Sequence, residues 1–68
     1  MDRKQFSRIL RQARQTKGIT QEQLAECAGF TSRAVQYWEQ GKKNITLENA
    51  AKLLDALGLE LKIEDKQV

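Results

Sequence analysis

The sequence predicts an all-α domain, a compact bundle of four to five helices that ends in a short β-strand. Through most of the 68 residues, apolar side chains recur at spacings of three and four, the period of an amphipathic helix. Threonines stand where helices would begin, glycines stand where they would end, and the chain contains no proline. Only the segment after Gly58 changes to alternation of apolar and polar side chains, which is typical of a strand.

Size and composition exclude several classes of protein. A chain of 68 residues forms one domain at most, residues 1–68, near the lower limit for a fold held by a single apolar core. One cysteine excludes an internal disulfide, and the lack of histidine removes the usual zinc ligands, so we expect neither a metal nor a cofactor. The N-terminus lacks the apolar run of a signal peptide, and no stretch approaches the roughly 20 apolar residues that cross a bilayer. We therefore expect a cytoplasmic protein with no membrane partner.

The first helix is expected over residues 2–17, with Asp2 as its N-cap and Gly18 as its end. Its two faces differ strongly in polarity. The apolar face carries Phe6, Ile9, Leu10 and Ala13, and the opposite face carries Arg3, Lys4, Arg8 and Arg11.

Residues 20–41 predict two short helices joined by a tight turn. Thr20 can cap the first of them, and Gln23 completes a capping box three residues later. Gly29 ends this helix, Thr31 offers a second N-cap, and Gly41 lies where a left-handed C-terminal glycine is expected. The apolar residues whose spacing predicts an inward face are Leu24, Ala25 and Ala28 in the first of these helices and Val35 and Trp38 in the second.

A fourth helix is expected between Thr46, its N-cap, and Gly58. Leu53 falls at the margin of its apolar face. That face comprises Leu47, Ala50, Ala51, Leu54 and Leu57.

The tail predicts a strand that needs a partner. Leu59, Leu61 and Ile63 alternate with charged residues, and no other segment of the chain has this period. A single strand must leave its edge exposed or pair with another, so we expect residues 59–64 to pair with the same strand of a second copy in a homodimer. A short fifth helix or an extended arm lying on the core is the alternative.

Charge is distributed unevenly along the chain. Residues 1–43 contain nine Lys or Arg and four Asp or Glu, whereas residues 44–68 contain three and five. The basic part includes the two short helices, which favours a polyanionic partner such as nucleic acid. A merely solvated surface is the alternative.

The segment TQEQLAECAGFTSRAVQYWEQG, followed by Lys42, Lys43 and TLENAAKLLDALG, resembles the helix-turn-helix domain of the Cro and CI phage repressors, the XRE-type family. The resemblance covers residues 3–58. It implies a lambda-repressor-like fold and a repressor that binds double-stranded DNA. In that family the second helix of the motif, which begins here after Thr31, enters the major groove with its N-terminal residues at the base edges.

The resemblance also assigns roles to individual residues. Arginine can pair with guanine and glutamine with adenine, so the chemistry of Arg33 and Gln36 suits base reading. An ion pair between Arg14 and Glu39 would hold the first helix to the recognition helix. The implied base-reading residues are Ser32, Arg33, Gln36 and Tyr37, and the implied phosphate-binding residues are Gln21, Thr31, Lys42 and Lys43.

The tail GLELKIED is similar to the C-terminal strand of HipB-type antitoxins, which are dimers that repress their own operon and bind a HipA-type kinase toxin. This resemblance implies a HipA-like kinase as a second partner. The alternative function is a protein-interaction module that mainly neutralises a partner, with weak or no DNA binding. We do not expect an enzyme, because the chain lacks histidine and clustered carboxylates. Cys27 is interpreted as a small helix residue, with redox sensing as the alternative.

Overall fold

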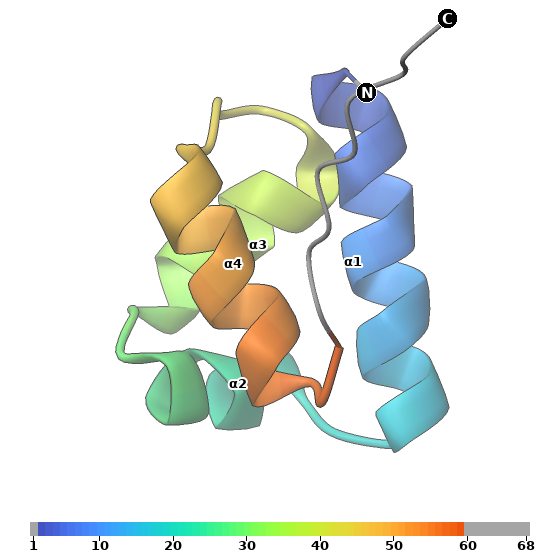
Figure 1. Ribbon diagram of the computed structural model, residues 1–68, viewed down its shortest axis with the longest axis vertical. Coiled ribbons are helices and arrows are strands. Elements are labelled where there is room, and N and C mark those ends of the chain that lie inside the picture. The colour runs from blue at the N-terminus through green and yellow to red at the C-terminus, as the bar shows by residue number, and fades with distance from the viewer. Residues whose placement is uncertain (1, 60–68) are drawn as a thin grey trace, which may run out of the picture.

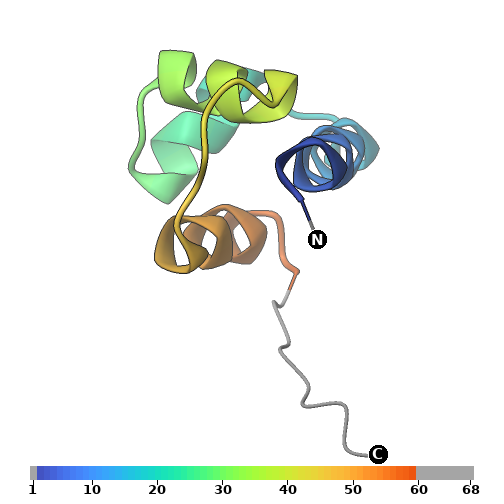
Figure 2. The same ribbon diagram turned by 90° about the horizontal axis from the view of Figure 1, so that it is seen from above.

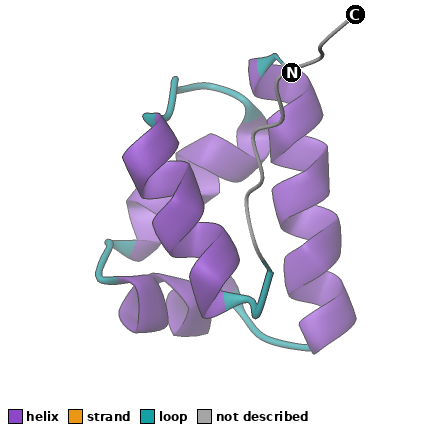
Figure 3. Cartoon of the chain, in the orientation of Figure 1, coloured by secondary structure: helices purple, strands orange, loops and turns teal. Residues whose placement is uncertain are grey.

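The computed structural model describes residues 2–59, and these residues form four helices. They are α1 (Arg3–Lys17), α2 (Gln21–Ala28), α3 (Ser32–Gln40) and α4 (Leu47–Ala56). Figure 1 shows the long α1 beside the other three helices, and Figure 3 shows the short loops that join them. The view from above places α1, the α2 and α3 pair, and α4 around a common centre (Figure 2). The predicted all-α fold is confirmed, whereas the predicted strand lies, except for Leu59, outside the described residues.

The helix boundaries follow local capping chemistry. The Gln23 backbone N–H donates to Thr20 Oγ1 over 3.0 Å, and the Thr20 backbone N–H donates to Gln23 Oε1 over 2.8 Å, which completes the predicted capping box. Asp2, Thr31 and Thr46 accept equivalent bonds at the starts of the other helices. Each such N-cap stabilises the fold by about 0.5–2 kcal/mol.

One apolar core lies between the four helices. Trp38 is only 8% exposed, as predicted; its ring packs edge-on against Phe30 at 5.0 Å between centroids, and its Nε1 donates to the Asn44 carbonyl over 3.2 Å. The buried apolar residues are Phe6, Leu10, Leu24, Ala25, Val35, Trp38, Ala50, Leu53, Leu54 and Leu57.

The prediction of which residues form the apolar faces of α1 and α4 is partly wrong. Ile9 is 42% exposed and Leu47 is 60% exposed, whereas Leu53, expected at the margin, is completely buried. The buried stripe of α4 is rotated toward Leu53, so Leu47 and Ala51, one turn apart, face outward. Leu47 is also the first residue of its helix, and none of the other three helices within residues 2–59 buries it.

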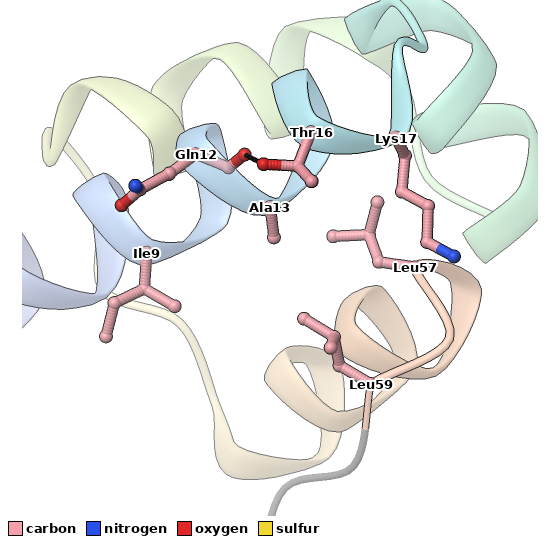
Figure 4. Close-up of a pocket in the computed structure, with 7 residues that line it drawn as sticks. All are labelled: Ile9, Gln12, Ala13, Thr16, Lys17, Leu57 and Leu59. Carbon is pink, nitrogen blue, oxygen red and sulfur yellow. Dashed lines mark hydrogen bonds between the residues drawn. The ribbon is translucent and has the colours of Figure 1, made fainter.

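Ile9 borders an apolar groove between α1 and the end of α4. Figure 4 shows Ile9 and Ala13 of α1 on one side and Leu57 and Leu59 on the other. Leu59, which lines this groove, is 46% exposed and is the last described residue. Within residues 2–59 no helix has the length and apolar character needed to cross a membrane.

Candidate nucleic-acid interface

Helix α3 presents opposite faces to the core and to solvent. Val35, Trp38 and Glu39 are buried against the rest of the fold. Ser32, Arg33 and Gln36 are exposed, and Tyr37 is half-buried. Arg33 takes part in neither of the two ion pairs formed within residues 2–59. The three exposed side chains are therefore available to a ligand that lies along the outside of α3.

The N-terminal halves of α2 and α3 border a polar hollow of about 330 Å³ that is open to solvent. It is lined by Thr20, Gln21, Glu22, Ser32 and Gln36. Gln21, a predicted phosphate ligand, thus lies beside two of the predicted base readers. Glu22 is unfavourable to a phosphate in this hollow, although its charge stabilises the N-terminus of α2.

Thr31 acts first as the N-cap of α3. Its Oγ1 accepts a hydrogen bond from the Ala34 backbone N–H over 3.1 Å. Because the hydroxyl hydrogen is not used by this bond, the side chain can still donate to a phosphate at the helix N-terminus.

A buried polar network fixes the position of α3. Arg14 donates from Nε to Glu39 Oε2 over 2.6 Å and from Nη2 to Glu39 Oε1 over 3.0 Å. Its Nη1 also donates to the Ile19 carbonyl over 2.8 Å. The Glu39 side chain is 2% exposed and that of Arg14 is 14% exposed. The ion pair therefore joins α1, the loop before α2, and α3.

Gln21 belongs to the same network, although the sequence did not predict this contact. Its Nε2 donates to Glu39 Oε1 over 3.0 Å. The bond orients the amide, because a carboxylate accepts from the NH₂ group and repels the carbonyl oxygen. One N–H and the carbonyl oxygen remain for an external partner. No sequence pattern links positions 21 and 39, so only the fold could reveal this contact.

The predicted phosphate ligands Lys42 and Lys43 are exposed in the loop after α3. Lys43 Nζ lies 5.5 Å from the centroid of the Tyr37 ring, within the range of a cation–π interaction. Tyr37 is therefore grouped with Lys43 at the C-terminal end of α3, one turn away from Ser32 and Arg33.

Other candidate chemistry is sparse in this part of the chain. Cys27 is an exposed free thiol on α2. Among residues 2–59 no three His, Cys, Asp or Glu side chains form a group that could hold a metal ion.

Two short helices joined by a tight turn, with the second held by its inner face and polar on its outer face, define a helix-turn-helix DNA-binding module. A helix-turn-helix family model matches residues 10–63. The chain therefore belongs to the XRE-type helix-turn-helix family of DNA-binding regulators.

Two solved structures are closely similar. The restriction-modification controller protein C.AhdI from Aeromonas hydrophila is 38% identical, with 84% of this chain and 83% of that chain covered and a TM-score of 0.81. HipB, in the structure of a HipA-HipB-O2-O3 complex, is 27% identical, with 98% and 94% covered and a TM-score of 0.82. Comparison with curated proteins found no significant match.

Proposed function

We propose that this protein is a sequence-specific repressor that binds double-stranded DNA as a homodimer on a pseudo-palindromic operator. The exposed row of Ser32, Arg33 and Gln36 on α3 carries this proposal. Arg33 offers the fork of donors that fits guanine O6 and N7, and the Gln36 amide fits adenine. The buried Arg14 and Glu39 pair holds this row in a fixed orientation.

Phosphate contacts would set the orientation of α3 in the groove. Gln21 and Thr31 lie at the N-terminal ends of α2 and α3, and Lys42 and Lys43 follow the C-terminal end of α3. The four residues thus flank the base-reading row at both ends. They would supply affinity for any sequence, whereas the row between them would supply selectivity.

A dimer supplies the second recognition helix that an operator of useful length requires. Leu59, Leu61 and Ile63 of two chains would pair across a two-fold axis and place the recognition helices about 34 Å apart, one turn of DNA. The exposed apolar groove at Ile9 and Leu59 supports a contact in this region. The dimer would repress by occupying promoter DNA in the cytoplasm, at the nucleoid.

DNA binding is tested by a band shift at physiological salt, with the genomic DNA that flanks the gene as probe and random DNA as competitor. A shift that survives the competitor supports the proposal. The absence of any shift would contradict it and favour a protein-interaction module that mainly neutralises a partner.

Dimerisation is tested by sedimentation of Leu61→Glu. The control is Lys62→Glu, because Lys62 belongs to the charged face of the proposed strand. We expect Leu61→Glu to dissociate and Lys62→Glu to stay dimeric. Equal dimer strength in the wild type and in Leu61→Glu would refute pairing through the tail.

A HipA-like kinase toxin is proposed as a further partner, which would make the protein the antitoxin and autorepressor of its operon. The match to HipB supports this, because it covers 98% of the chain and therefore includes most of the tail. Co-expression with the product of an adjacent kinase-like gene should yield a complex that co-purifies. Separate elution of the two proteins, or the lack of such a gene, would contradict this role.

A further inference from the structure

Helix α1 carries an unusual concentration of positive charge. Its sequence, RKQFSRILRQARQTK, contains six Lys or Arg and no acidic residue. Arg14 is neutralised by Glu39, but Lys4 and Arg8 are like charges one turn apart, and Arg3 and Lys4 lie in the first turn, at the positive end of the helix dipole. The Asp2 N-cap places one carboxylate at this end of the helix, whereas the repulsion between Lys4 and Arg8 destabilises it and would be relieved by a bound anion.

Three of these side chains lie together beside the C-terminal end of α3. Lys4, Arg8 and Arg11, here named the α1 basic strip, are exposed and follow one another at spacings of four and three. With Ser7, Glu39 and Gln40 they line a hollow of about 290 Å³. Arg11 Nη2 donates to the Glu39 carbonyl over 2.9 Å, which fixes its guanidinium at the rim and leaves other donors available.

The acidic residue in this hollow does not cancel the charge of the α1 basic strip. The Glu39 carboxylate is bonded to Arg14 and Gln21, and it is the Glu39 carbonyl that accepts from Arg11. Three positive charges therefore face the solvent with no acidic side chain of residues 2–59 in an ion pair with them.

The α1 basic strip is continuous with the DNA-reading face of α3. Ser32, Gln36 and Gln40 follow at intervals of four residues along one side of the helix. Ser32 and Gln36 line the hollow shared with α2, and Gln40 lines the hollow shared with the α1 basic strip. A ligand lying along this row would meet Gln21 at one end and the strip at the other.

We propose that the α1 basic strip is a second phosphate-binding surface, which holds the DNA backbone at the end of the recognition face opposite Gln21. The proposal rests on the proposed function, since its occupant is the same DNA. Positive charge and continuity with the base-reading row support this occupant. Phosphate contacts here would raise affinity for all sequences without reading any base.

The test compares two double variants that each remove two positive charges. Lys4→Gln with Arg8→Gln alters the strip, and Lys17→Gln with Lys52→Gln alters exposed lysines elsewhere. Affinities for the promoter fragment and for random DNA are measured over a range of salt concentrations. The logarithm of the binding constant falls as the logarithm of the salt concentration rises, with a slope of about −0.9 for each phosphate contact. We therefore expect this slope to be less steep by about 1.8 in the strip variant than in the wild type. The control should change the slope much less.

The outcomes separate this proposal from the proposed function. Equal slopes for the two double variants, with promoter selectivity retained, would overturn only the role of the strip. If the strip variant kept the wild-type slope but no longer co-purified with a protein partner, the role in DNA binding would also be overturned, and the strip would be assigned to an acidic protein. If the wild type bound no DNA, both proposals would be wrong. Arg8→Gln alone removes one phosphate contact, so its slope should be less steep than that of the wild type by about 0.9.

Discussion

Substitution of Arg14 by methionine is expected to remove much of the stability of the fold. The change deletes both bonds to Glu39 and the bond to the Ile19 carbonyl, and leaves a carboxylate that is 2% exposed with only Gln21 as partner. Loss of one member of a buried ion pair costs about 3–5 kcal/mol. A domain of 68 residues has a free energy of unfolding of about 3–10 kcal/mol, so the loss is from about a third to all of it.

Removing both charges should be far less harmful than removing one. In Arg14→Met with Glu39→Met no charge is left buried, so we expect a cost below about 2 kcal/mol. Gln21, which is only half-buried, can turn its amide to water. The matched surface control is Lys52→Met, which breaks an exposed pair of 3.8 Å and should cost less than about 1 kcal/mol.

Urea unfolding followed by the fluorescence of Trp38, the single tryptophan, measures these differences directly. A cost below about 1 kcal/mol for Arg14→Met would refute the view that Arg14 compensates the buried charge of Glu39. So would a double variant as unstable as the single one.

Two further predictions concern local structure. Gly41 and Gly29 both adopt left-handed φ, of 71° and 82°, so alanine at either should cost about 1–2 kcal/mol. Gly41→Ala should cost more, because its Cβ would lie 3.1 Å from Ser7 Oγ whereas nothing lies within 4 Å at Gly29; equal losses in urea unfolding would contradict this. Thr20→Ala should cost about 0.5–2 kcal/mol through loss of the cap, whereas Thr16→Ala, in the last turn of α1, should be neutral or stabilising by up to about 0.7 kcal/mol. Thermal unfolding that ranks the two threonine variants in reverse order would show that the cap does not stabilise α2.

The helix boundaries could be predicted because they depend on neighbours in the sequence. Thr20 bonds to Gln23, and Thr31 and Thr46 bond three residues ahead, so a short window of sequence contains the whole interaction. The end of α2 is also recognisable locally, because Gly29 adopts a left-handed backbone conformation that other residues disfavour.

Burial could be predicted only in part, because it depends on how helices pack. Leu47 and Leu53 both fit an apolar face by spacing, yet the rotation of α4 against the other helices exposes one and buries the other. The bond between Gln21 and Glu39 was missed for the same reason, since 18 residues separate them and packing of α2 against α3 brings them together. The individual roles expected for Arg33 and Gln36 came from the family resemblance, whereas the charge distribution alone left a merely solvated surface as an alternative.

In the proposed complex with DNA, α3 reads bases while the loop after it holds phosphates, and these two roles can be separated by comparing one variant of each. Dissociation constants are measured on the promoter fragment and on random DNA for the wild type, Arg33→Ala and Lys43→Ala. We expect Arg33→Ala to reduce the preference for the promoter by about 1–3 kcal/mol, and Lys43→Ala to weaken binding to both DNAs alike. Equal losses on both DNAs for Arg33→Ala would contradict base reading by α3.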